Sequence, residues 1–109
     1  MAIKAGDIDQ RISIEAATYR RNEYGEPVAT WAEAWKRWAE VKVLTGSEAY
    51  RARAVVATAS IQVRIRYLEG VTARHRINWK GRILEIGAVL GNKREGEMTL
   101  LCTESPDAG

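Results

Sequence analysis

The residues with the clearest chemical potential in this chain are arginines that alternate with apolar residues near its middle. In Ile61-Gln62-Val63-Arg64-Ile65-Arg66-Tyr67 every second residue is apolar. A period of two is typical of a β-strand with one buried face. The apolar residues are therefore expected to face a core. Arg64 and Arg66 are expected to point outward, where they need either water or an anionic partner.

Basic residues are concentrated in one part of the chain. The net charge is +3, but residues 51–82 contain eight basic residues against one acidic residue, a local balance of +7, and the remainder carries −4 from 9 basic and 13 acidic residues. This asymmetry is typical of a nucleic-acid surface or of a subunit whose basic side meets the acidic side of its neighbour, although a solvated arginine face fits equally well. The candidates for a subunit interface or a DNA channel are Arg51, Arg53, Arg64, Arg66, Arg74 and Arg76.

Residues in a catalytic or metal-binding pattern are missing from the sequence. There is no glycine-rich phosphate loop, no metal-ligand spacing and no nucleophile placed beside a histidine. The single histidine, His75, is expected to be a surface loop residue, and the single cysteine, Cys102, a small buried hydrophobic residue. We therefore expect no enzyme and no catalytic, cofactor or metal site.

The length and the pattern of the 109 residues favour a single strand-rich domain. A hairpin is expected where the Lys80-Gly81 pair connects strands at residues 76–79 and 82–86, because glycine supplies the positive φ of tight turns. Other strands are expected at residues 11–15, 38–43, 61–67 and 98–103, and residues 104–109 are expected to form a flexible tail. No apolar run is long enough for a membrane span, so no membrane partner is expected.

One helix and one long loop complete the expected fold. Thr45-Gly46-Ser47-Glu48 matches a capping box, which predicts a helix from about Ser47 to Ala57. The polar, turn-rich stretch from about Ala17 to Thr30 predicts a long loop, in which Tyr19 to Pro27 are expected to be disordered in the free subunit and to become ordered on docking. Its candidate docking residues are Tyr19, Arg20, Arg21 and Tyr24.

Three tryptophans follow this stretch at helical spacing. Trp31 and Trp35 are expected to lie in a turn before the second strand, which begins at Trp38, and all three rings are expected to seal the core or a subunit contact. Base stacking on these rings is the alternative, but only one Lys-Arg pair stands beside them.

The order of several short motifs resembles the phage head-tail joining family, the head-completion or stopper proteins of long-tailed phages, prophages and gene transfer agents. The resemblance covers nearly the whole chain. The motifs are Ala5-Gly6, Arg11-Ile12-Ser13-Ile14, Asn22-Glu23-Tyr24-Gly25-Glu26, Trp38-Ala39-Glu40-Val41, Gly46-Ser47-Glu48, Arg64-Ile65-Arg66-Tyr67, Gly70-Val71-Thr72 and Gly81-Arg82-Ile83-Leu84-Glu85-Ile86.

This resemblance implies a small antiparallel β-barrel with an inserted helix and a long mobile loop. It also implies a homo-oligomeric ring beneath the portal or its adaptor, which retains packaged double-stranded DNA through weak contacts and provides the docking surface for tail proteins. The protein would be located at the head-tail junction of the virion, and in the host cytoplasm during assembly. The free chain would be either a ring or a monomer that assembles on a template.

Two other functions remain open on the residues alone. An OB-like module that binds single-stranded nucleic acid through an arginine face would bind as a monomer and in a salt-sensitive manner. A tail terminator, another small ring-forming β protein of the same particle, is separated from a head-completion protein only by the family likeness.

Overall fold

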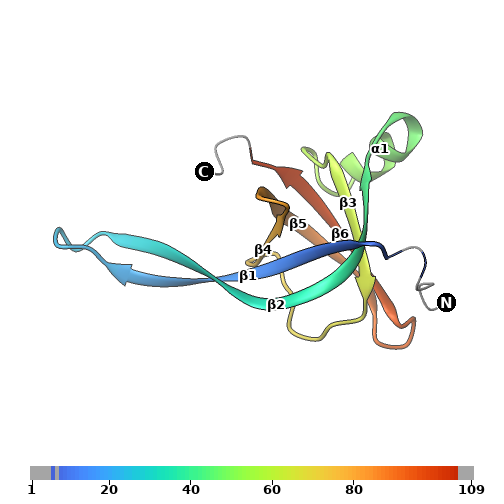
Figure 1. Ribbon diagram of the computed structural model, residues 1–109. Coiled ribbons are helices and arrows are strands. Elements are labelled where there is room, and N and C mark those ends of the chain that lie inside the picture. The colour runs from blue at the N-terminus through green and yellow to red at the C-terminus, as the bar shows by residue number, and fades with distance from the viewer. Residues whose placement is uncertain (1–5, 7, 106–109) are drawn as a thin grey trace.

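The computed structural model describes Gly6 and residues 8–105, which form a six-stranded antiparallel sheet with one α-helix (Figure 1). Strand β4 pairs with β1, so the order β1-β2-β3-β6-β5-β4 closes on itself. The expectation of a mainly β, antiparallel domain with one helix is confirmed. The elements are β1 (Gln10–Arg21), β2 (Pro27–Val43), α1 (Gly46–Arg53), β3 (Ile61–Arg66), β4 (Arg76–Trp79), β5 (Arg82–Asn92) and β6 (Glu97–Glu104).

The hydrophobic core lies inside the closed sheet. Ile61, Val63 and Ile65 on β3 are at most 2% exposed, whereas Arg66 is exposed, as the alternating pattern predicts. The other strands also contribute one inward face to this core, and no polar or charged residue within residues 8–105 is buried. The largest fully buried side chains are Ile12, Ile14, Ile65, Ile77, Leu84, Leu100, Val63 and Cys102.

The buried thiol of Cys102 is expected to make folding stability depend on alkaline pH. Burial raises the pKa of Cys102 from 9.0 to about 12. The unfolded chain therefore loses this proton at a lower pH than the folded chain, so the free energy of unfolding falls as the pH rises from 9 toward 12. Between pH 8 and pH 10 the loss should be about 1.4 kcal/mol. Urea unfolding of the native chain and of Cys102→Ala should show their stability difference shrinking by this amount, and parallel pH profiles would contradict it.

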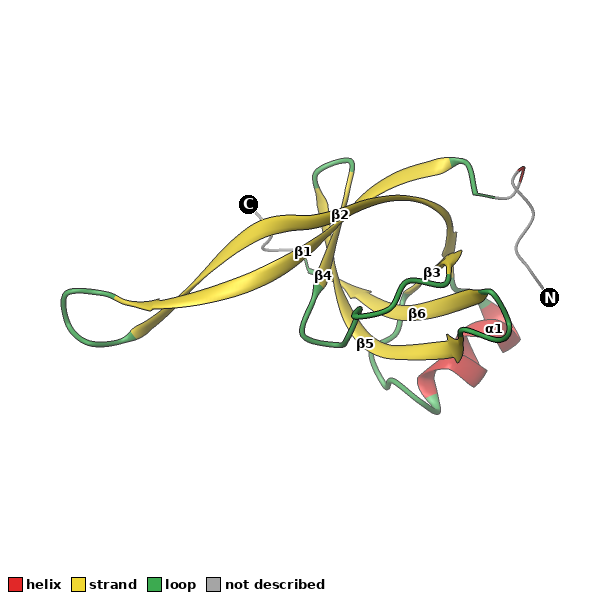
Figure 2. Cartoon of the chain, turned by 90° about the horizontal axis from the view of Figure 1, so that it is seen from below, coloured by secondary structure: helices red, strands yellow, loops and turns green. Residues whose placement is uncertain are grey.

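The predicted long loop over residues 17–30 is wrong, because all of these residues except the turn at 22–26 belong to β1 and β2, which form a hairpin. The two strands are paired from Gln10 with Ala39 to Arg21 with Pro27. Strand β4 reaches β1 only at residues 13–15, and β3 reaches β2 only at residues 40–43. Residues 16–32 therefore project from the closed sheet as a two-stranded arm, which we call the ribbon (Figures 1 and 2). The disorder expected for residues 19–27 is likewise not what the structure shows.

The turn at the end of the ribbon has its own network of hydrogen bonds. The Oδ1 atom of Asn22 accepts the backbone N–H groups of Tyr24 and Glu26 at 2.9 and 3.0 Å. Gly25 has a φ of +79°, and its carbonyl accepts a bond of 2.7 Å from the Arg21 guanidinium. The Asn and Gly residues that predicted a long loop thus serve only the five-residue connection between β1 and β2, and Pro27 is the first residue of β2.

A bulge in β2 separates Trp31 from Trp35, and both lie on this strand rather than in the expected turn. Ile14 pairs with Trp35, but its neighbour Glu15 pairs with Glu33, so Ala34 is an extra residue on β2. Without the extra residue, side chains at positions 31 and 35 would share a face. With it, Trp35 lies on the face of buried Ile14, and Trp31 lies on the opposite face.

Helix α1 begins where predicted but ends at Arg53 rather than near Ala57. The predicted capping box is wrong, since Thr45 makes no side-chain cap bond and Glu48 instead pairs with Lys42. Residues 54–58 continue as turns, in which the N–H groups of Val55 and Val56 both bond to the Ala52 carbonyl. The alanine face of α1 packs closely on its own sheet, outside β5 and β6, where Ala49 and Ala52 contact a cluster with Leu101 (Figure 2).

Candidate interaction surfaces

The base of the ribbon is held by an ion pair between β1 and β4. The Nε atom of Arg76 lies 2.7 Å from Oε1 of Glu15, and its guanidinium lies 4.3 Å from the ring centre of Trp31. On the same face, the hydroxyl of Ser13 bonds to Glu33 at 2.7 Å. These contacts fix the direction in which the ribbon leaves the closed sheet.

The segment between β3 and β4 closes over Trp35. The Trp35 ring lies 5.2 Å from the ring of His75, and a Cβ atom on Gly70 would lie 3.5 Å from it. Nδ1 of His75 accepts the backbone N–H of Thr72 at 3.1 Å. His75 lies in the loop between β3 and β4, as the sequence predicts, but it is half-buried and shapes this segment. Trp35 does seal the core, as expected.

The six candidate arginines of the sequence analysis do not form one surface. Two of them are tied to carboxylates of the same chain, since Arg76 pairs with Glu15 and Arg64 lies 3.8 Å from Glu40. Arg53 donates its Nε–H to the carbonyl of Ala59 at 3.1 Å. The other three are exposed in three places: Arg51 on α1, Arg66 at the end of β3, and Arg74 between β3 and β4.

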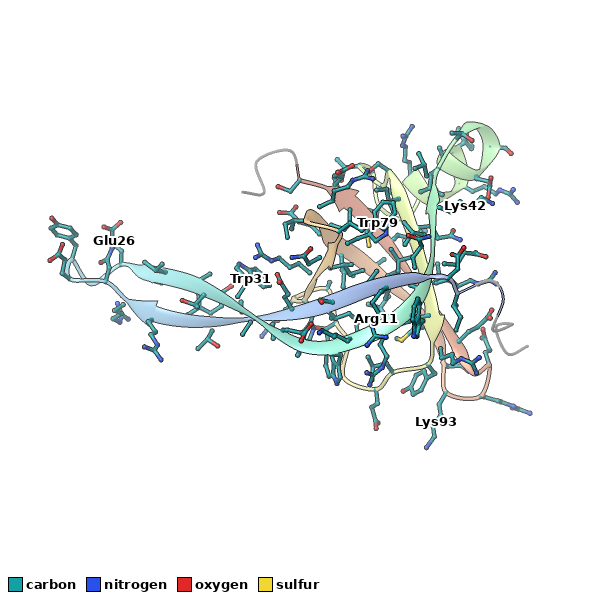
Figure 3. All side chains as sticks on the ribbon, in the orientation of Figure 1. Arg11, Glu26, Trp31, Lys42, Trp79 and Lys93 are labelled. Carbon is teal, nitrogen blue, oxygen red and sulfur yellow. The ribbon has the colours of Figure 1, made fainter. Side chains whose placement is uncertain are left out.

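The docking candidates Tyr19, Arg20, Arg21 and Tyr24 do lie together, at the outer end of the ribbon. All four are exposed, and the side chains of Tyr19 and Tyr24 are 69% and 78% exposed. Glu26 marks the same end in Figure 3, where Trp31 lies nearer the closed sheet. Whether these residues dock remains a prediction.

A basic pocket that sequence reasoning missed surrounds Trp38. The Trp38 side chain is 50% exposed, and the Arg11 guanidinium lies 5.1 Å from its ring centre. The cavity of about 300 Å³ is lined by Ile8, Arg11, Lys36, Arg37, Trp38 and Arg66. Within residues 8–105, none of its four basic side chains has a carboxylate at ion-pair distance. The signal in the sequence was the Lys36-Arg37-Trp38 run, but only strand pairing adds Arg11, and only the fold adds Arg66.

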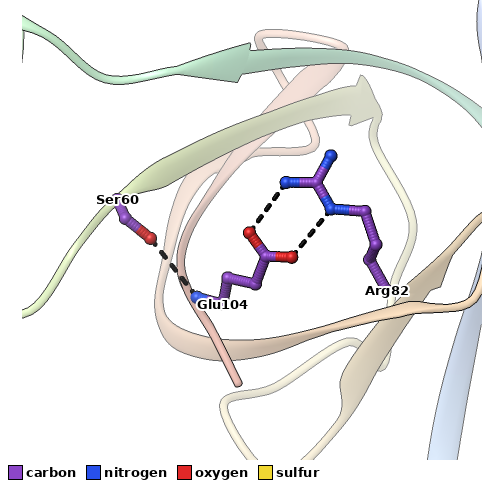
Figure 4. Close-up of polar contacts among 3 residues, drawn as sticks. All are labelled: Ser60, Arg82 and Glu104. Atoms are coloured by element: carbon purple, nitrogen blue, oxygen red, sulfur yellow. Dashed lines mark hydrogen bonds and ion pairs between the residues drawn. The ribbon is translucent and has the colours of Figure 1, made fainter. Parts of the chain in front are cut away.

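A polar clamp fixes the opposite end of the sheet. Arg82 makes two hydrogen bonds of 2.7 Å to the Glu104 carboxylate, and Ser60 accepts the Glu104 backbone N–H at 3.3 Å (Figure 4). The Arg82 bonds lower the pKa of Glu104, and the same bonds raise the pKa of Arg82. Arg82 also covers the Trp79 ring at 4.5 Å. This basic residue is therefore a structural one.

A second cavity, of about 420 Å³, lies between α1 and the ends of β5 and β6. Its lining mixes apolar residues such as Val55 and Leu90 with charged residues such as Glu48, Arg51 and Glu97. Unlike the Trp38 pocket, whose charged residues are all basic, this cavity is lined by charged residues of both signs. No group of three metal-ligating side chains occurs within residues 8–105, and no helix in that range has the length and hydropathy to cross a membrane.

Comparison with known proteins places this arrangement in a family. The model of the phage head completion protein family matches residues 3–105. Head completion protein gp7 of Enterobacteria phage HK97 is 29% identical over 106 residues, which cover 92% of this chain and 95% of gp7.

Two solved structures resemble the fold of this chain. One is the solution structure of protein SF1141 from Shigella flexneri 2a, with a TM-score of 0.78, 28% identity and coverage of 96% of this chain and 99% of that one. The other comes from the virion of a native gene transfer agent particle, with a TM-score of 0.62, 25% identity and coverage of 89% of this chain and 94% of that one. The family match extends over both strands of the ribbon, the helix and all strands of the closed sheet, and so this chain belongs to the phage head completion protein family.

Proposed function

We propose that this protein is a structural component of the head-tail junction of a phage-like particle. In this proposal its subunits form a ring beneath the portal or its adaptor, the ring retains the packaged double-stranded DNA, and its outer surface receives tail proteins. The closed sheet serves as a small barrel that forms the body of each subunit. The family membership supports a role in head completion, and the likeness to a chain in a gene transfer agent virion supports a place in the particle.

The observation that carries this proposal is the ribbon. An isolated two-stranded hairpin is at best marginally stable in water, yet this chain extends one by residues 16–32 beyond its core. Residues 18–30 are all exposed, and both edges of the ribbon leave backbone groups unpaired with a further strand. A rigidly based arm of this kind is well suited to reach another subunit of an assembly.

The proposed contacts depend on which charged side chains already pair with a group of the same chain. Arg64 and Arg76 face carboxylates of their own chain, so the exposed residues Arg51, Arg66 and Arg74 are better candidates for a neighbouring subunit or for passing DNA. The aromatic and basic residues at the end of the ribbon are proposed to dock onto another subunit of the junction. They are Tyr19, Arg20, Arg21 and Tyr24.

The test compares particles assembled with and without this protein by cryo-electron microscopy. We expect particles without it to package DNA, lose it and lack tails, and the missing density to form a ring at the portal exit. Purified protein is titrated with DNA in parallel over a range of salt concentrations. Normally closed, tailed particles in its absence would overturn the proposal. Tight, salt-sensitive binding by the monomer would then favour an OB-like module.

A further inference from the structure

The end of the ribbon and the Trp38 pocket are complementary in charge and in apolar character. The turn at residues 22–26 presents Tyr24, whose side chain is 78% exposed, between Glu23 and Glu26. Neither carboxylate has an ion pair within the described part of the chain. The pocket presents the half-exposed Trp38 ring among four basic side chains that also lack ion pairs there.

The two surfaces cannot meet within one molecule. Strand β2 connects them, since the turn ends just before Pro27 and residues 36–38 of the same strand line the pocket. The eleven residue-to-residue steps of extended strand from Pro27 to Trp38 span roughly 35 Å. Figure 3 shows the two regions well apart, with Glu26 at the outer end of the ribbon and Arg11 on the closed sheet. A partner for either surface must therefore come from another molecule.

We propose that the pocket around Trp38 receives the Glu23-Tyr24-Gly25-Glu26 turn of a second copy of this chain. Tyr24 then packs against Trp38, and the two glutamates pair with the basic side chains at the rim of the pocket. A cavity of about 300 Å³ is at the small end of the range for binding pockets, and it suits one large side chain better than a helix or a DNA duplex. The apolar residues Ile8 and Trp38 in its lining likewise favour an aromatic ring over a phosphate.

Arginines beside the turn do not cancel its charge. Arg20 and Arg21 precede the turn on β1, and the Arg21 guanidinium is engaged with the Gly25 carbonyl. The carboxylates of Glu23 and Glu26 are within 4.0 Å of neither arginine. They remain available to the four cations of a neighbour.

This contact joins two different patches, so each copy has one patch left for the next copy. Such a heterologous contact builds a ring if its rotation closes and an open filament if it does not. The inference rests on the proposed function, because it supplies the subunit contact of the proposed ring. It assigns that contact to the turn, Arg11, Lys36, Arg37 and Arg66, and leaves Arg51 and Arg74 as candidates for contact with passing DNA.

The test uses two charge-reversed variants that should fail separately and work together. The turn variant carries Glu23→Lys and Glu26→Lys, and the pocket variant carries Lys36→Glu and Arg37→Glu. Each is supplied to particles that lack the native protein, alone and as a mixture. Either variant alone brings like charges together and should lower the yield of closed, tailed particles about tenfold or more. In the mixture, each turn finds a pocket of opposite charge, and the yield should rise again.

A matched control reverses the charge of another exposed Lys-Arg pair. Lys93 and Arg94 lie in the turn between β5 and β6 and do not line the pocket, so Lys93→Glu with Arg94→Glu should leave the yield unchanged. Circular dichroism and thermal unfolding confirm that every variant is folded before it is scored.

Direct proximity is measured by cross-linking in assembled particles. Cys102 is buried with a pKa of about 12, so introduced cysteines at positions 26 and 36 are the reactive thiols toward a short bismaleimide at neutral pH. Glu26→Cys with Lys36→Cys should give a ladder of covalent multimers. Each single variant should give almost no dimer.

Separate outcomes overturn separate claims. If particles lacking the protein are closed and tailed, the proposed function fails. If the native protein is required, yet both reversed variants support assembly, or the mixture gives no recovery, or cross-linked particles show no ladder, the inference about the pocket fails. Loss of duplex DNA binding by the pocket variant with normal assembly would assign the pocket to nucleic acid instead.

Discussion

Replacing residues 18–30 by an Asn-Gly turn is expected to abolish tail attachment while leaving the closed sheet folded. The substitution joins Ala17 to Trp31, which face each other across the hairpin, and Asn-Gly favours the two-residue turn that such a pair requires. None of the buried core residues lies within residues 18–30. The free energy of unfolding should therefore change by less than about 1 kcal/mol. Tailed particles should fall by at least two orders of magnitude, as for an assembly arm that has lost its contacts.

The matched control keeps the ribbon and changes one residue at its end. Tyr24→Ser preserves the length of both strands and the Asn22 hydrogen bonds, which involve the backbone of residue 24. It should reduce tailed particles less than the shortened ribbon does. The yield is counted by electron microscopy, and folding is checked by the dispersion of amide resonances. A shortened protein that is folded and still supports tail attachment would show that the ribbon has no assembly role.

The sequence predicts the closed sheet well because its strands have one buried face. A period-two pattern exists only where alternate residues enter a core, as at Ile61, Val63 and Ile65. The Lys80-Gly81 turn was predictable for a local reason, and both residues indeed have positive φ values of 54° and 84°. These features depend on neighbouring residues alone.

The ribbon could not be predicted in the same way, because neither of its faces is buried. Its β1 strand contains Thr, Tyr and Arg, its β2 strand contains Val, Ala and Thr, and every residue from 18 to 30 is exposed. The alternation of apolar and polar residues that marks a strand is therefore absent, and only the pairing between the two strands reveals the ribbon. The bulge at Ala34 adds a second difficulty, since it places Trp31 and Trp35 on opposite faces although their spacing resembles a helix.

The candidate site was only partly predictable because charges find partners in three dimensions. Arg64 and Arg76 look like free outward cations in the sequence, but strand pairing brings each of them near a carboxylate. Conversely, Arg11 and Arg66 are far apart in sequence from Trp38, yet line the same pocket. A count of charges along the sequence identified the basic region. Ion pairs formed in the fold decide which of its basic side chains can still bind a partner.

Gly91→Ala is expected to be the most damaging small substitution on the sheet. Gly91 lies on β5 opposite Met98 with a φ of +108°, a region that L residues rarely adopt. A Cβ atom there would lie 2.6 Å from the Glu97 carbonyl oxygen and 2.9 Å from the Met98 Cα atom, both backbone atoms of β6. The backbone conformation costs about 1–2 kcal/mol and the overlap about 1–3 kcal/mol, so the free energy of unfolding should fall by about 3 kcal/mol.

Gly81→Ala separates these two costs, because Gly81 shares the positive φ but not the contact. Its φ is +84°, and a Cβ atom there would meet nothing within 4 Å. This variant should lose only the conformational cost, about 1–2 kcal/mol. Urea unfolding of both variants measures the difference, and equal losses would mean that β6 moves aside at no cost. A larger loss for Gly91→Ala would show that the backbone of β6 is rigid at its pairing with β5, as the proposed ring would require if neighbouring subunits are to meet a fixed surface.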